Sequence, residues 1–242
     1  MYKFNLALKR ISDVALSGIA LLVLLPVFLV LSVVIKLDSK GPVFFLQERR
    51  GINGTLFKMY KFRSMVVDAE KMGTGLFNYE NDPRVTKVGR FIRNTSLDEL
   101  PQLLNVFLGD MSLVGPRPCV SYELGNYETL NLRYKKRFQV LPGITGLAQV
   151  SGRNEIPWDE KVNLDNEYIE LFKKKGCLLD FQILIKTILK VFQSKNIYEE
   201  KQDEEMSDEL AAKQAEIEII AKAHQLEEAD LLLIKEKEKE MN

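Results

Sequence analysis

The stretch VALSGIALLVLLPVFLVLSVVI, residues 14–35, decides the fold, because its 22 residues carry no charge. A straight helix of that length is about 33 Å long, enough to cross the core of a bilayer. The run is too long for a cleaved signal peptide, and no A-x-A-like site closes it. A buried helix of a soluble core is the alternative, but such helices usually have a polar face and this one has none. We therefore expect residues 1–38 to form a membrane helix.

Basic residues flank this segment on both sides, and such flanks prefer the cytoplasmic side of a membrane. Pro26, near the centre, removes a backbone hydrogen bond and kinks the helix. Both features favour a re-entrant hairpin that enters and leaves the membrane on one side, with a single straight span as the alternative. The flanking cations are Lys3, Lys9 and Arg10 before the segment, and Lys36, Lys40, Arg49 and Arg50 after it.

The composition limits which side chains can carry a catalytic or metal site. Among 242 residues there is one histidine, His224, which excludes a multi-histidine metal site, and two cysteines that form no CxxC pair. Residues 199–242 hold 15 acidic and 6 basic residues, a net charge of −9, and residues 1–198 hold 19 acidic and 28 basic residues, a net charge of +9. A basic body suggests an anionic partner such as phosphate, nucleic acid or lipid headgroups.

We predict a mostly helical α/β monotopic membrane protein with three parts: the membrane helix 1–38, a small globular catalytic domain 39–198 and an acidic helical tail 199–242. Residues 40–70 read as short strands with a turn at Asn53-Gly54. Residues 97–108, 158–172 and 180–193 read as amphipathic helices, the last in a membrane interface or in the core. Residues 109–153 are rich in Gly and Pro and read as loops. The tail is a weak coiled coil or a solvated helix.

The densest set of reactive side chains is RNTSLDELP, residues 93–101. One interpretation of this segment is purely structural, because Ser96 and Glu99 match the capping box of a helix. The functional one is that a helix N-terminus keeps the Asp98 carboxylate ionised as a nucleophile, while Glu99 beside it helps to bind Mg²⁺.

Several cations could converge on this acidic pair, although each alone is more often a surface charge. Arg117 lies between two prolines that restrict its backbone, and arginine grips phosphate bidentately. Arg153 follows a glycine-rich turn, and Lys61 and Arg63 share one face of an expected strand. The cluster of Arg133, Lys135, Lys136 and Arg137 reads as a surface or headgroup patch.

Five motifs in order resemble those of the bacterial sugar transferase family, the monotopic polyprenyl-phosphate phosphoglycosyl transferases. The resemblance covers about residues 3–195 and leaves out the tail. The family's usual Ser-Pro helix break is Leu25-Pro26 here. The motifs are DPRVTKVGR (82–90), SLDELPQ (96–102), GDMSLVGPRP (109–118), PGITG (142–146) and GRN (152–154).

The resemblance implies that Asp98 attacks the sugar-bearing phosphate of a UDP-sugar, UMP leaves, and polyprenyl (undecaprenyl) phosphate then takes the sugar phosphate from Asp98. Glu99 would bind Mg²⁺ with Asp98 or act as a base in the second step, and Arg93 would orient the pair. The family's other active-site positions are Lys61, Arg117, Arg153 and Asp165 here.

The expected location is the cytoplasmic face of the bacterial inner membrane, in surface polysaccharide synthesis such as capsule, exopolysaccharide or O-antigen. The donor sugar stays open between a hexose and an N-acetylhexosamine. Partners would be membrane lipids and, through the tail, a second copy of the chain. The alternative function is an inactive membrane-anchored adaptor that acts through its coiled-coil tail. A nucleic-acid-binding protein fits less well, because no aromatic stacking platform accompanies the basic residues.

Overall fold

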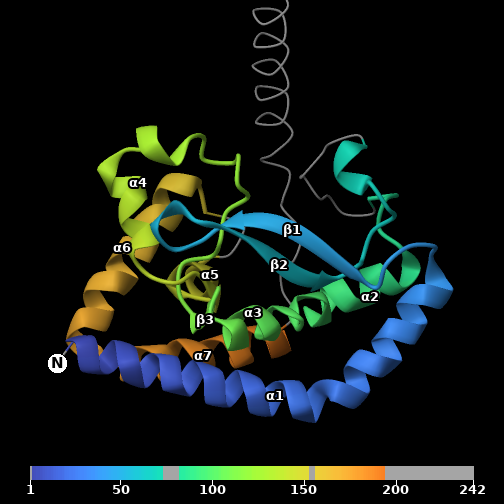
Figure 1. The fold of residues 1–242 in the computed structure, drawn as a ribbon, viewed down its shortest axis with the longest axis horizontal. Coiled ribbons are helices and arrows are strands. Elements are labelled where there is room, and N and C mark those ends of the chain that lie inside the picture. The colour runs from blue at the N-terminus through green and yellow to red at the C-terminus, as the bar shows by residue number, and fades with distance from the viewer. Residues whose placement is uncertain (1, 73–81, 153–155, 194–242) are drawn as a thin grey trace, which may run out of the picture. The chain divides into compact units, whose positions relative to one another are not determined.

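The computed structural model describes residues 2–72, 82–152 and 156–193 (Figure 1). The predicted tail, His224 and Arg153 lie outside the described residues. The described part is mostly helical, as the sequence predicts, and contains two small sheets. The helices and strands are α1 (Tyr2–Asp38), β1 (Phe44–Arg50), β2 (Leu56–Phe62), α2 (Lys87–Asn94), α3 (Gln102–Leu108), β3 (Ser112–Val114), α4 (Leu132–Lys136), β4 (Gly143–Thr145), α5 (Leu147–Ser151), α6 (Trp158–Lys175) and α7 (Cys177–Gln193). Short 3-10 turns are η1 (Ile52–Gly54), η2 (Ala69–Lys71), η3 (Leu97–Glu99), η4 (Tyr127–Thr129) and η5 (Arg137–Gln139).

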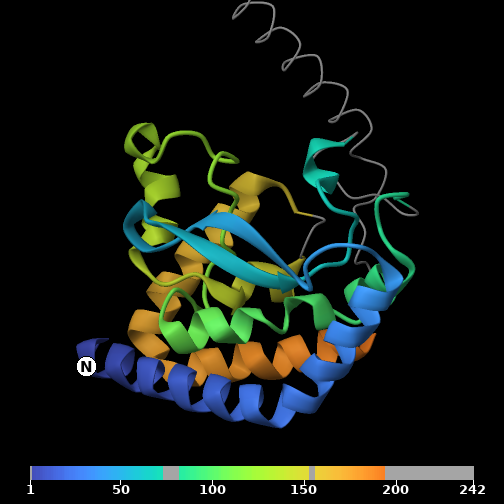
Figure 2. The same cartoon turned by 45° about the vertical axis from the view of Figure 1, so that its right-hand side comes forward.

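Helix α1 contains the uncharged stretch and leaves most of it exposed. It is the one described helix long and apolar enough to cross a membrane, judged by length and composition. Its buried residues are only Asp13, Ser17, Leu31 and Ile35. Figures 1 and 2 show that the helix bends along its course, and Pro26 lies inside it. A helix with so much exposed apolar surface is consistent with association with a membrane.

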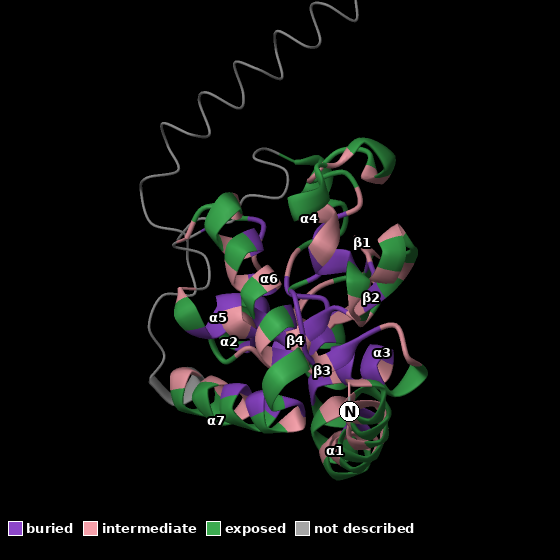
Figure 3. Ribbon diagram, turned by 90° about the vertical axis from the view of Figure 1, so that its left-hand side faces the viewer, coloured by how far each residue is buried: buried purple, intermediate pink, exposed green. Residues whose placement is uncertain are grey.

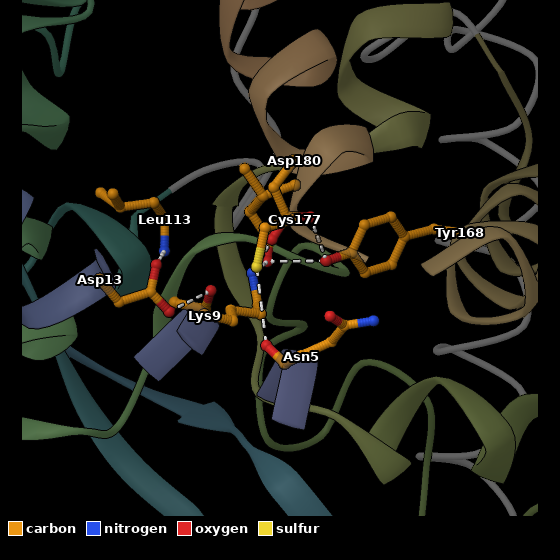
Figure 4. A network of polar contacts seen from close by, with 9 residues as sticks. Asn5, Lys9, Asp13, Leu113, Tyr168, Cys177 and Asp180 are labelled. Atoms are coloured by element: carbon orange, nitrogen blue, oxygen red, sulfur yellow. Dashed lines mark hydrogen bonds and ion pairs between the residues drawn. The ribbon is translucent and has the colours of Figure 1, made fainter. Parts of the chain in front are cut away.

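The first part of α1 is bound to the globular body by buried polar groups (Figure 4). Lys9 Nζ donates to Asp180 Oδ2 of α7 at 2.6 Å and to the carbonyl of Val114 at 2.9 Å. One turn later, the Asp13 carboxylate accepts a hydrogen bond from the backbone N–H of Leu113 at 3.1 Å. Lys9 therefore binds a carboxylate and a carbonyl of the protein, although the sequence alone suggested only a flanking cation.

The last part of α1 packs on the same body through apolar contacts. Leu31 and Ile35 form a buried cluster with Phe62 and Ile92. Arg63 Nη2 donates to the carbonyl of Ser39 at 2.6 Å, just beyond the last turn of the helix. Arg63 thus binds the C-terminal end of α1, and the expectation that it shares a site with Lys61 is wrong, because the strand ends at Phe62.

Strands β1 and β2 form the antiparallel hairpin that the sequence predicts. Phe44 pairs with Phe62 at one end, and Arg50 pairs with Leu56 at the other. The turn lies at Asn53-Gly54, where both residues have positive φ. Asparagine and glycine adopt this conformation at lower cost than other residues, which explains the signal in the sequence.

Residues 109–153 are not only loops, contrary to our expectation. Strands β3 and β4 pair in parallel, with Ser112 opposite Gly143 and Val114 opposite Thr145. A Cβ atom on Gly143 would lie 2.1 Å from the nitrogen of Gly115, and one on Gly146 would lie 2.2 Å from the Gly115 carbonyl oxygen. The glycines therefore allow two strands to pack closely. In the sequence alone, such glycines look the same as the glycines of a loop.

Helices α6 and α7 cover this second sheet. Their inner faces contribute Tyr168, Phe172 and Ile183 to a buried cluster with Val114. The outer face of α7 is exposed, so the helix belongs to the core on one side only (Figure 3). Its exposed apolar residues are Leu178, Phe181, Ile185, Ile188 and Leu189.

Candidate active site

Asp98 and Glu99 lie in the 3-10 turn η3, between α2 and α3. The predicted helix 97–108 is interrupted here: η3 ends at Glu99, and α3 begins after Pro101. Ser96 has a positive φ of 56° and its side chain caps nothing, so the expected capping box is absent. A serine in this conformation is uncommon and strained, and such strain concentrates at functional sites. Because no capping box forms at Ser96, Glu99 is not used as a helix cap.

The Glu99 carboxylate binds two cations that are distant in sequence. Lys61 Nζ of β2 lies 3.1 Å from Glu99 Oε1, and Arg117 Nη2 lies 2.6 Å from the same oxygen. The Lys61 and Glu99 side chains are mostly buried, whereas that of Arg117 is 45% exposed. Three of the predicted site residues therefore meet, and Arg117 opens to solvent, where it can reach an anionic ligand.

Asp98 differs from its neighbour because no described residue donates a hydrogen bond to its carboxylate. The residue is only 9% exposed. Burial raises its pKa to about 6, the adjacent Glu99 charge acts in the same direction, and Lys61, Arg93 and Arg117 oppose the rise. Asp98 does not lie at the N-terminus of an α-helix, as we expected, since η3 is a 3-10 turn of only three residues. The rise in the pKa of Asp98 shows that burial outweighs the nearby cations.

Glu99 carries the more stable negative charge. Burial by itself would raise the pKa of Glu99, but Arg117 and Lys61 together lower it well below its ordinary value. The pKa of Lys61 is lowered by burial, with Glu99 opposing. Glu99 is thus held by two cations. Asp98 has no hydrogen-bond donor among the described residues, and its pKa is raised to about 6.

Arg93 lies at the last turn of α2. Its Nη1 is 3.5 Å from the Ser64 hydroxyl, and its charge is among those that lower the pKa of Asp98. It therefore lies near the acidic pair without a hydrogen bond to it. The predicted site residue Arg153 lies outside the described residues.

Asp165 does not contact the acidic pair. It is 2% exposed in α6, and its Oδ2 lies 2.9 Å from Nη2 of Arg137. Arg137 is itself buried, so it does not belong to the surface or headgroup patch that we predicted from Arg133, Lys135, Lys136 and Arg137. The other members are also engaged within the protein: Arg133 pairs with Asp159, Lys136 pairs with Glu170, and Lys135 donates to the carbonyl of Glu128.

Two positioning residues escaped the sequence analysis. Asn105 of α3 is fully buried; its side chain accepts from the N–H of Tyr60 at 2.9 Å and donates to the carbonyl of Lys58 at 2.8 Å. The amide thus holds the strand that carries Lys61 against α3, and a polar residue on the apolar side of an amphipathic helix was the available signal. Arg49 donates to the carbonyl of Pro118 at 3.0 Å, next to Arg117.

The acidic pair also suits a divalent cation of the magnesium type. Mg²⁺ is commonly held by one or two carboxylates together with substrate phosphates and water. The unbound Asp98 carboxylate offers one such ligand, and Glu99 beside it could offer a second if its cations moved to the substrate. Within the described residues, no cluster of three or more His, Cys, Asp or Glu side chains offers a complete protein site.

The family of the chain follows from comparison with known sequences. The model of the family "Bacterial sugar transferase" matches residues 4–194, which include nearly all of α1 and the acidic pair. The chain belongs to the bacterial sugar transferase family. The match also ends just before the acidic tail begins.

Several curated relatives of this bacterial sugar transferase are similar over most of its length. The UDP-glucose:undecaprenyl-phosphate glucose-1-phosphate transferase of Klebsiella pneumoniae is 43% identical over 196 residues, 80% of this chain and 42% of that protein. The undecaprenyl-phosphate galactose phosphotransferase of Salmonella typhimurium is 42% identical over 205 residues, 79% of this chain and 42% of that protein. This chain therefore spans less than half the length of these two relatives.

A shorter relative matches over nearly its full length. The exopolysaccharide production protein ExoY of Rhizobium meliloti is 39% identical over 204 residues, which are 78% of this chain and 88% of that protein. The region that the family model matches contains most of α1 and the acidic site.

Proposed function

We propose that this bacterial sugar transferase moves a sugar 1-phosphate from a UDP-sugar to undecaprenyl phosphate and releases UMP. The named relatives support the substrate classes, since they transfer glucose or galactose phosphate to this lipid. The observation that carries the proposal is the contrast within the acidic pair: Asp98 has an unbound carboxylate, and Glu99 is fixed by Lys61 and Arg117. The donor sugar, glucose, galactose or an N-acetylhexosamine, is left to experiment.

In the first step, an oxygen of ionised Asp98 attacks the phosphorus that bears the sugar. The bond from that phosphorus to the bridging oxygen breaks, and UMP leaves with this oxygen. Arg117 and Lys61 can exchange Glu99 for the diphosphate oxygens and so stabilise the charge that develops there. The product is a phosphosugar ester of the Asp98 carboxylate.

In the second step, a phosphate oxygen of the lipid attacks the same phosphorus. The bond between phosphorus and the Asp98 oxygen breaks, which restores the carboxylate and yields undecaprenyl-diphosphate-sugar. The low pKa of Glu99 makes it a poor base. We therefore assign Glu99 the task of holding Lys61 and Arg117 in place when no substrate is bound.

Magnesium is the proposed cofactor of this site. When bound, it would neutralise phosphate charge during the displacement. Asp98 and Glu99 are the residues that would hold it, together with the donor diphosphate.

The substitution Asp98→Asn tests the proposed chemistry. The amide is nearly isosteric but cannot form the phosphosugar ester, so we expect UMP release from a panel of UDP-sugars to be lost. Intact mass analysis of the native protein after donor alone should show one added sugar phosphate, mapped to Asp98. A native protein that releases no UMP would support the alternative of an inactive adaptor, and an adduct on another residue would contradict the mechanism.

We also propose that α1 enters and leaves the cytoplasmic leaflet on the same side. Support comes from the two ends of the bent helix, since Lys9 and Asp13 bind the body near one end and Leu31 and Ile35 pack on it near the other. Single cysteines at Lys3 and Lys40 should both react with an impermeant thiol reagent added to the cytoplasmic face. Labelling of the two positions from opposite faces would restore a single span.

A further inference from the structure

The backbone of residues 116–119, Pro-Arg-Pro-Cys, is held at four successive carbonyl groups. The carbonyl of Pro116 accepts from the N–H of Gly143 at 2.9 Å, and that of Cys119 accepts from the N–H of Arg50 at 3.0 Å. Between them, the carbonyls of Arg117 and Pro118 accept from arginine side chains, Arg137 and Arg49. Prolines have no N–H, so carbonyls are the main backbone groups by which this segment can be held.

One of these donors, Arg137, belongs to a buried ion pair. Arg137 Nη2 donates to the Arg117 carbonyl at 2.7 Å and lies 2.9 Å from Asp165 Oδ2, so one nitrogen contacts both groups. Arg137 is 3% exposed and Asp165 is 2% exposed. The Trp158 ring lies 5.1 Å from the guanidinium carbon and covers it. Asp165 is the described carboxylate that lies against this buried guanidinium.

A continuous series of contacts therefore leads from Asp165 to the acidic pair. Asp165 holds Arg137, Arg137 holds the backbone of Arg117, and the Arg117 side chain binds Glu99 at 2.6 Å. The Arg117 side chain is half exposed and can turn toward a phosphate, whereas its backbone is fixed by buried groups. Such preorganisation lowers the entropic cost of aligning a cation with a reacting phosphate.

We propose that Asp165 and Arg137 are positioning residues that act on catalysis through Arg117. This inference rests on the proposed transferase function and assigns Asp165 a role other than substrate binding. The two residues set where the Arg117 guanidinium can reach, and neither touches the donor.

A double-mutant cycle on steady-state UMP release tests this assignment, with kcat and KM measured for each variant. Asp165→Asn should lower kcat/KM about tenfold in the native background, mainly through kcat, because a misplaced cation weakens transition-state binding. In an Arg117→Ala background the same change should cost less than about twofold, since the path through Arg117 is already lost. Losses that multiply in the double variant would overturn the inference.

The matched control is Asp159→Asn on the same helix. Asp159 forms an exposed ion pair with Arg133 of α4, and its loss should leave kcat/KM within about twofold of native, because exposed pairs contribute little. If Asp165→Asn does not fold, Arg137→Lys replaces it in the cycle with the same expectation and the same contrary result. A native protein without UMP release would refute the transferase function as well, whereas native release with multiplicative losses would refute only the positioning role.

Discussion

At the scale of single residues, the site depends on two adjacent carboxylates in unlike environments. Asp98 is buried without a hydrogen-bond donor among the described residues, and its pKa rises to about 6. Glu99, one residue later, is bound by Lys61 and Arg117, which lower its pKa despite burial. Adjacent residues can differ in this way because electrostatic environment depends on the groups packed around each side chain.

The raised pKa of buried Asp165 predicts that the free energy of unfolding depends on pH. Burial raises its pKa from 3.8 to about 6, while Arg137 and Lys161 oppose the rise. The folded protein then holds this proton more tightly than the unfolded chain, so the resulting stability is complete below about pH 4 and lost as the pH rises through about 6. Between these limits the free energy of unfolding of the native protein should fall by about 3 kcal/mol relative to that of Asp165→Asn.

Thermal unfolding of both proteins in detergent, from pH 4 to pH 7.5, measures this difference. Asp159→Asn serves as the control and should run parallel to the native protein. A gap between native protein and Asp165→Asn that stays constant over this range would contradict the raised pKa.

At the scale of elements, α1 is long and apolar enough to cross a membrane and is also part of the globular body. Its exposed face is apolar, yet Lys9, Arg10 and Asp13 bind α7, α3 and β3. Strand β3 leads directly into the segment that carries Arg117. The packing of α1 and the position of the Arg117 cation therefore depend on the same short strand.

Breaking the pair between α1 and α7 should destabilise the protein. Lys9→Met leaves Asp180 with Tyr168 as its remaining hydrogen-bond donor in the part of the chain that the structure describes, and we expect a loss of about 2–3 kcal/mol in the free energy of unfolding. Adding Asp180→Asn removes the unpaired charge and should recover at least half of that loss. Denaturation in detergent measures both variants, and a double variant less stable than Lys9→Met would contradict this explanation.

At the scale of the whole molecule, charge is divided along the chain. Residues 1–198 carry a net charge of +9 and residues 199–242 a net charge of −9. The family match ends at residue 194, so it leaves the acidic part out. The matched region, residues 4–194, includes most of α1, the hairpin, the acidic pair and helices α6 and α7.

A chain that ends after Ile197 should keep its chemistry. All the contacts described for the acidic pair lie before that residue, so UMP release should stay within about twofold of the rate of the complete chain, as for changes remote from a site. The assay compares both proteins at equal concentration of folded protein in the same detergent. Loss of release by a folded truncated protein would show that the acidic tail takes part in the reaction.

The sequence by itself determined the features that depend on neighbouring residues. The uncharged run 14–35, the Asn53-Gly54 turn and the Asp98-Glu99 pair could be recognised because hydrophobic length, turn conformation and motif are local properties. Ordered motifs were also enough to identify the family, which the comparison confirmed.

Only the tertiary structure decided which charges meet. Lys61 and Arg117 lie 38 and 18 residues from Glu99, and nothing in their local sequence distinguishes them from Arg63, which binds the end of α1 instead. Glycines that indicated loops proved to allow two strands to pack closely, and Asp165 proved to support Arg137. Convergence, burial and the pKa shifts that follow from them depend on groups distant in the chain, so they exist only once the chain is folded.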